Sequence, residues 1–115
     1  LSYSLEEIKL EKYRAILTRK YFQERDLFDL FLIKDSLNAD IKLIIEKIKN
    51  SALIKKDLVS LITEKLILLQ NNSFFKSKEK VENLSIIKYD EGEFENFKQK
   101  IKPILIEICN KFLEK

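Results

Sequence analysis

Glycine and proline are almost absent from this chain, which has one of each in 115 residues. Sheet-rich domains need both residue types in their turns, whereas α-helices exclude them from their interiors. The sequence therefore excludes a sheet-rich fold. It predicts an all-α domain, a bundle of five to six helices.

Histidine is missing altogether, and Cys109 is the only cysteine. One cysteine allows no disulfide within the chain, which predicts a reducing, cytoplasmic setting. Without histidine the sequence offers neither a zinc site nor a histidine-based acid–base or nucleophile system. Cys109 lies among apolar residues of the last expected helix, so we expect a buried, inert thiol.

Long hydrophobic runs are also missing. Apolar residues make up 45% of the chain and charged residues 36%, but no apolar run approaches the ~18 residues that a membrane span needs. We therefore expect no membrane association. The apolar share is too high for a disordered chain. A net charge of +3 permits contact with nucleic acid without arguing for it.

Apolar periodicity and capping residues predict where the helices lie. Ser4 and Glu7 form a capping box, so the first helix is expected to start there and to run to about Phe22. Apolar residues on all sides of the segment after Asp26 predict a central, buried second helix. Further helices are expected at residues 39–49, 56–70, 74–83 and 93–113. Pro103 predicts a kink or break in the last of these, residues 90–92 a turn, and residues 84–89 an extended or irregular stretch.

Two cations near the start of the chain share one face of the first expected helix. Lys12 and Arg19 are seven residues apart, nearly two helical turns, and the small Ala15 lies between them. This arrangement leaves room for an anion such as a triphosphate. The alternative is a solvated basic edge, on which Lys12→Ala would change stability by about 0.5 kcal/mol at most. Arg14 is expected to point elsewhere on the same helix.

An Arg–Asp pair opens the second apolar segment. Asp26 suits a helix N-cap, which satisfies free backbone donors and favours the helix dipole; it could equally pair with Lys12 or Arg19. Asparagine caps as well as aspartate, so Asp26→Asn is expected to leave stability unchanged. Asp29 lies one turn further on. It either supports the residues that would touch a ligand or faces Arg25 or Arg19.

Together these residues form a recognisable pattern. Residues 11–19 read E-K-x-x-A-I-L-x-R, and after five residues the segment 25–31 reads R-D-L-F-D-L-F. Their order and spacing resemble the signature in the C-terminal half of the AbiEii/AbiGii-type toxin nucleotidyltransferases, members of the DNA polymerase β-like nucleotidyltransferase superfamily. The resemblance implies that Lys12 and Asp26 lie in an active site. Lys12, Arg19 and Arg25 would bind nucleotide phosphates, with Asp29 behind them.

The resemblance also implies an activity. Such enzymes transfer a nucleoside monophosphate from an NTP to an acceptor, which in toxins can be the 3′ end of tRNA, and an antitoxin can be a partner. The superfamily holds Mg²⁺ through G-S followed by D-x-D or D-x-E, and the 115 residues contain no such motif. The chain also lacks methionine. We therefore expect a single helical domain, residues 1–115, of a longer enzyme whose N-terminal half catalyses. By itself it should hold no cofactor, bind NTP only weakly and be inactive.

The alternative belongs to another functional class: a helical interaction domain whose basic first helix docks a protein partner or RNA. Tyr21 and Phe22, next to two cations, could stack on a base, although most aromatic side chains are expected in the core. The many lysines among the glutamates of the later helices are expected to form a solvated face.

Overall fold

Five helices make up the part of the chain that the computed structural model describes, which is residues 4–33, 35–51, 53–71, 73–75 and 90–114. They are α1 (Leu5–Thr18), α2 (Glu24–Leu32), α3 (Ile41–Lys49), α4 (Lys55–Gln70) and α5 (Glu91–Leu113). The described residues include no strand, so the all-α prediction is confirmed. The predictions for residues 76–89 lie outside the described part.

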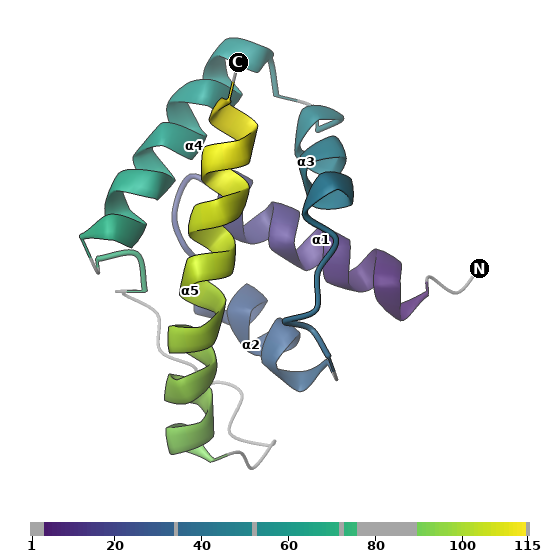
Figure 1. The fold of residues 1–115 in the computed structure, drawn as a ribbon, viewed down its shortest axis with the longest axis vertical. Helices are drawn as coiled ribbons and strands as arrows, with labels where there is room; N and C mark the ends of the chain where they lie inside the picture. The colour runs from purple at the N-terminus through teal and green to yellow at the C-terminus, as the bar shows by residue number, and fades with distance from the viewer. Residues whose placement is uncertain (1–3, 34, 52, 72, 76–89, 115) are drawn as a thin grey trace.

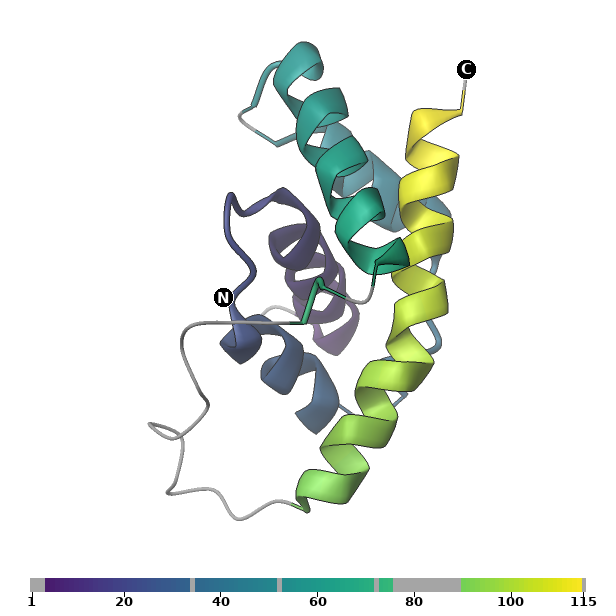
Figure 2. The ribbon, with the colours of Figure 1, turned by 90° about the vertical axis from the view of Figure 1, so that its left-hand side faces the viewer.

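The helices form a bundle in which α4 and α5 lie side by side (Figure 1; Figure 2). Helix α1, which passes behind α5 in the view of Figure 1, contacts α2, α3 and α4. The fold therefore brings the first helix against α3 and α4, which follow it at a distance in the sequence. No described helix has the length and apolar character required to cross a membrane.

Three helices begin at the residues that capping chemistry favours. Ser4, Asp40 and Asp90 each accept a backbone N–H from the first turn of the helix that follows. The predicted turn at residues 90–92 is wrong, because Asp90 is the N-cap and Gly92 already belongs to α5. Of the kink or break predicted at Pro103, the break is absent, because α5 is continuous through this residue. Pro103 is exposed, so water can reach the backbone near its ring.

The junction of α1 and α2 differs from the prediction. Helix α1 ends at Thr18, earlier than expected, because Arg19 adopts an extended conformation with φ −70° and ψ 143°. Helix α2 begins at Glu24 with Gln23 as its N-cap, and Gln23 makes no side-chain capping bond. Asp26 is thus the third residue of α2. Its predicted role as an N-cap is wrong, and its carboxylate is directed toward α1 instead.

The core is formed by apolar side chains from all five helices. Phe28 of α2 packs edge-on against Phe94 of α5, with ring centroids 5.6 Å apart. The sulfur-bearing Cys109 is fully buried, as predicted. Helix α2 is less completely buried than its composition suggested, since Leu32 is half exposed. The buried apolar residues of the described part include Leu10, Tyr13, Ile16, Leu17, Leu27, Phe28, Leu30, Ile44, Ile48, Leu58, Ile62, Leu69, Phe94, Ile101, Leu105 and Ile108.

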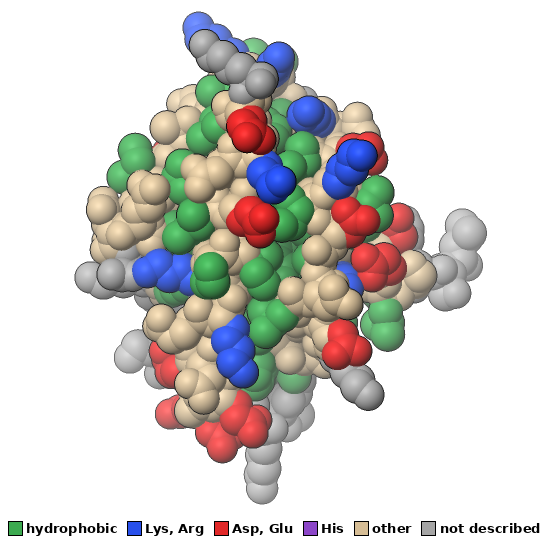
Figure 3. Space-filling view, viewed as in Figure 1, with side chains coloured by type: hydrophobic (Ala, Val, Ile, Leu, Met, Phe, Trp, Pro, Cys, Tyr) green, Lys and Arg blue, Asp and Glu red, His purple; other side chains and the backbone are tan. Residues whose placement is uncertain are grey.

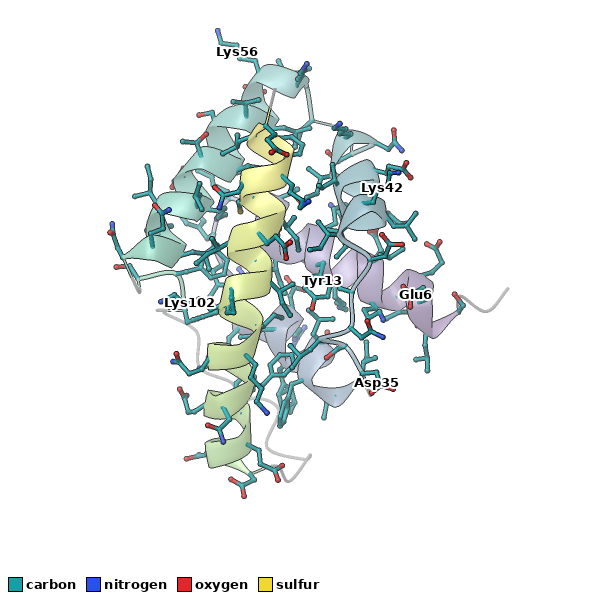
Figure 4. The ribbon with its side chains drawn as sticks, in the orientation of Figure 1. Glu6, Tyr13, Asp35, Lys42, Lys56 and Lys102 are labelled. Atoms are coloured by element: carbon teal, nitrogen blue, oxygen red, sulfur yellow. The ribbon has the colours of Figure 1, made fainter. Side chains whose placement is uncertain are left out.

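Charged side chains divide into an outer and an inner set. Among the charged side chains, Lys56 and Glu6 point away from the bundle (Figure 4). The uncharged side chain of Tyr13, by contrast, lies between the helices (Figure 4). On the face that carries α5, acidic and basic side chains are interspersed around apolar ones (Figure 3). Lys65 and Lys98, however, are buried. For these two lysines the prediction of a solvated face is wrong.

Candidate functional site

A surface groove of about 590 Å³ runs along α1 and is completed by the first turn of α2 and by α3. Four of its side chains are cationic and three are carboxylates, so the lining is slightly basic. The residues that line it are Glu7, Ile8, Glu11, Lys12, Arg14, Ala15, Arg19, Asp26 and Lys47.

Asp26 is the centre of an ion cluster at one end of this groove. Its carboxylate is only 3% exposed. Arg19 Nε donates to Asp26 Oδ2 over 2.6 Å, and Lys12 Nζ lies 3.7 Å from Oδ1. Lys12 also pairs with Asp29 Oδ2 at 2.7 Å. Lys12 and Arg19 both reach Asp26 and both line the groove, but they do not share a helical face as predicted, because α1 ends at Thr18 and Arg19 is extended.

Local backbone structure explains this convergence. Lys12 projects from the third turn of α1, and Ala15, one turn later, adds only a methyl group between the two cations. Arg19 follows the last helical residue, and its side chain turns back toward α2. The carboxylates come from one face of α2, since Asp26 and Asp29 are three residues apart.

The two cations keep hydrogen-bonding capacity on the solvent side. A guanidinium has five N–H donors and an ammonium three. Arg19 directs one donor to each oxygen of Asp26, at 2.6 and 3.5 Å. Within the described part of the chain no acceptor is recorded for its other donors. The Arg19 side chain is 52% exposed and that of Lys12 29%. An anion that entered the groove would therefore meet donors held from behind by carboxylates.

Three further predicted positions can be placed. Asp29 faces neither Arg25 nor Arg19 but binds Lys12. Arg25 is exposed and does not line the groove. Arg14 was expected to point elsewhere on α1, but it lines the same groove as Lys12. There it is tied to Glu11 by a 2.9 Å ion pair.

Lys47 of α3 is a groove residue that the sequence did not reveal. Its Nζ lies 3.0 Å from a carboxylate oxygen of Glu7 and 3.6 Å from one of Glu11. Hydrogen bonding to Glu7 raises the pKa of Lys47, and hydrogen bonding to Arg14 lowers the pKa of Glu11. These pairs join α1 to α3. Lys47 is 36 to 40 positions away from its two partners in the sequence. Helical periodicity relates only residues within a few turns of one another, so it could not predict these pairs.

The carboxylates at this end of the groove do not fit a resident Mg²⁺. Magnesium needs oxygen ligands at about 2.0–2.1 Å in near-octahedral geometry. The oxygens of Asp26 and Asp29 already face Lys12 and Arg19, which would repel a divalent cation. Within the described residues no group of three or more His, Cys, Asp or Glu side chains is placed to hold a metal.

The fold and the groove define a helical domain with a basic anion-accessible groove braced by carboxylates. A comparison of the sequence with known protein families then assigns the chain to one family. Residues 1–112 match the family described as nucleotidyl transferase AbiEii toxin of type IV toxin–antitoxin systems, and the chain belongs to this family. No curated protein and no solved structure matches it.

Proposed function

We propose that this chain supplies the phosphate-binding half of the active site of a toxin nucleotidyltransferase. Lys12 and Arg19 bind the triphosphate of an NTP, and Asp26 holds both cations in place from the protein side. The observation that carries this proposal is the convergence of Lys12 and Arg19 on one buried carboxylate at the edge of a solvent-facing groove. Membership of the AbiEii family supplies the chemical class.

The physical argument concerns preorganisation. Two flexible basic side chains lose rotamer freedom when they close on an anion, which weakens binding. Here the ion pairs with Asp26 and Asp29 restrict Lys12 and Arg19 before a ligand arrives. A phosphate can then accept from the remaining donors while Asp26 keeps its bonds. Arg25, exposed on the outer side of α2, contributes only long-range attraction.

The remaining parts of the reaction lie outside these residues. Mg²⁺, when bound with the nucleotide, supplies charge neutralisation and activation of the acceptor hydroxyl. The carboxylates that hold it come from the rest of the enzyme, because the side chains here do not fit it. The acceptor that we propose is the 3′ end of tRNA. Lys12 and Arg19 fix the position of the triphosphate, which sets where the α-phosphate meets that hydroxyl.

Binding can be tested on this chain because it contains only three arginines, Arg14, Arg19 and Arg25. Each gives one Nε–H signal in a ¹⁵N-correlated NMR spectrum. Addition of ATP should shift the Arg19 signal and leave Arg25 nearly unmoved. Lys12→Ala should weaken this response severalfold. The matched control is Lys42→Ala, which removes an exposed lysine of α3 that does not line the groove.

Transfer must be tested in the complete enzyme. The assay follows labelled NTP incorporated into tRNA, and Lys12→Ala should reduce it severely while Lys42→Ala leaves it intact. Robust labelling of tRNA by the 115-residue chain alone would show that the catalytic carboxylates have been assigned to the wrong part of the protein. Full activity of Lys12→Ala would leave the solvated-edge interpretation standing.

A further inference from the structure

The link between α1 and α2 determines where the Arg19 side chain points. Arg19 is the first non-helical residue after α1, and its backbone is extended. Its Nε nevertheless donates to Asp26, seven residues further along the chain. The link itself is short, and Gln23 makes no side-chain capping bond at the start of α2. The geometry of the Arg19–Asp26 pair therefore depends on how this link is held.

A buried lysine from a distant helix holds it. Lys65 Nζ, on α4, donates to the backbone carbonyl of Lys20 over 3.1 Å, across 45 residues of sequence. Lys65 is only 1% exposed. The acceptor carbonyl belongs to the residue that directly follows Arg19. This bond consequently restrains the peptide plane one residue beyond the Arg19 side chain.

The charge of Lys65 is unfavourable in this environment. Burial is the main influence on its pKa, which it lowers, opposed by the charge of Glu64. No described carboxylate forms an ion pair with Lys65. A buried charge without such a partner destabilises a fold, and an apolar side chain of similar length would fill the same space. Packing alone thus gives no reason for a lysine at this position.

Other long side chains restrain α2 in the same manner. Lys98 of α5 bonds Glu24, the first residue of α2, at 3.1 Å. After α2, the hydroxyl of Tyr13 donates to the carbonyl of Ser36 over 2.8 Å. Both flanks of the helix that carries Asp26 are therefore anchored by polar side chains from the surrounding helices. Lys65 is distinguished among them because its acceptor adjoins Arg19.

We infer that Lys65 is a positioning residue, which holds the α1–α2 link so that Arg19 meets Asp26 in the phosphate-binding geometry. The inference rests on the proposed function only in the use that it assigns to this geometry, which is phosphate binding. The positioning itself is a property of this chain and requires neither nucleotide nor activity. It can therefore fail while phosphate binding by Lys12 stands, and it can hold where phosphate binding fails.

The test again uses the arginine Nε–H signals. In the parent chain, Arg14 and Arg19 donate through Nε to carboxylates, so both signals should exchange slowly with water, and that of exposed Arg25 quickly. Lys65→Met places an unbranched apolar side chain, one heavy atom shorter, in the same buried space and removes the donor. Arg19 exchange should accelerate roughly tenfold or more, as expected for the loss of a charge-assisted hydrogen bond. Arg14 exchange should stay unchanged.

The control is Thr63→Ala, also on α4, which removes an exposed hydroxyl bonded to the carbonyl of Val59. Thr63→Ala should leave the exchange rates of all three arginine Nε–H signals unchanged. Equal acceleration at Arg14 and Arg19 in Lys65→Met would overturn the inference, because Lys65 would then stabilise the whole bundle. Unchanged Arg19 exchange would overturn it too.

Should Lys65→Met not fold, Lys65→Gln provides the second variant. It keeps a donor on a shorter side chain that does not reach the Lys20 carbonyl in the same way. Selective acceleration at Arg19 supports the inference. Failure of both variants to fold would assign Lys65 to core stability and contradict a positioning role.

Discussion

The α4–α5 pair and the α1–α2 pair are built on different principles. Helices α4 and α5 bury aliphatic side chains against the core, such as Ile62, Leu69 and Ile108. Helices α1 and α2 meet across an ion cluster in which the carboxylate of Asp26 is buried. The first pair derives its stability from apolar area removed from water. The second pair also buries apolar side chains such as Leu17 and Leu27, but it additionally aligns charges at its edge, and such alignment contributes specificity more than stability.

This difference suggests a division of labour within the bundle. The apolar pair provides a rigid frame, and the polar pair presents Lys12 and Arg19 to solvent at its edge. Lys65 connects the two, because it projects from α4 to the α1–α2 link. Substitutions in the frame should therefore change stability first, and substitutions in the cluster should change ligand binding first.

The largest effect on stability is expected in the frame. Ile108 is fully buried on α5, and removal of its branched side chain leaves a cavity. Ile108→Ala should lower the free energy of unfolding by about 2–5 kcal/mol, as measured by urea denaturation. The folded fraction should still shift its Arg19 signal on addition of ATP. A loss of ligand response in folded protein would mean that frame and cluster are not separable.

A smaller effect is expected at Asp26. The structure revises the sequence-based expectation for Asp26→Asn, because Asp26 is no N-cap but the acceptor of a charge-assisted bond from Arg19. Loss of that bond should lower the free energy of unfolding by about 1–2 kcal/mol, moderated by the half-exposed position of Arg19. Chemical denaturation at neutral pH measures it. Unchanged stability would show that the Arg19–Asp26 pair contributes nothing measurable to the free energy of unfolding.

The burial of Lys65 should be detectable in the way the free energy of unfolding depends on pH. Its pKa is lowered in the folded chain from 10.5, mainly by burial. At pH values below the pKa of Lys65 in the folded chain, the folded state bears the full cost of burying a charged lysine. This cost decreases as the pH rises from that pKa toward 10.5, the value of an exposed lysine. The parent chain should therefore gain stability relative to Lys65→Met in that window, by at most about 1.4 kcal/mol per pH unit. Parallel curves for the two proteins would show that folding does not change the pKa of Lys65, which would contradict the expected lowering.

The smallest effect on stability is expected at Lys12. Its side chain is partly exposed and pairs with two carboxylates, and such pairs contribute little in water. Lys12→Ala should change the free energy of unfolding by about 0.5 kcal/mol, measured beside the ATP response. Weakened binding with nearly unchanged stability would sharpen the contrast with Ile108→Ala. A large destabilisation would place Lys12 in the frame.

Several features of the site could be predicted before the structure. Helical periodicity is local, so it could indicate which side of α1 Lys12 occupies, but Arg19 lies beyond the end of α1 and reaches Asp26 through the α1–α2 link. The pairing of Asp26 with either cation was one of the alternatives left open, and both pairs form. The sequence could not indicate that Arg14 shares the groove, because Lys47 of α3 completes that wall.

The chain's sequence by itself determined the all-helical fold, the capped start of α1 and the family. Each depends on neighbours within a few residues: scarce glycine and proline, an oxygen at the N-cap, or a contiguous motif. Only the tertiary structure decided that α1 ends at Thr18, that Asp26 turns inward, and that Lys65 is buried against the Lys20 carbonyl. These outcomes depend on partners as many as 45 residues away, and a polar side chain shows its partner only when the fold brings the two together.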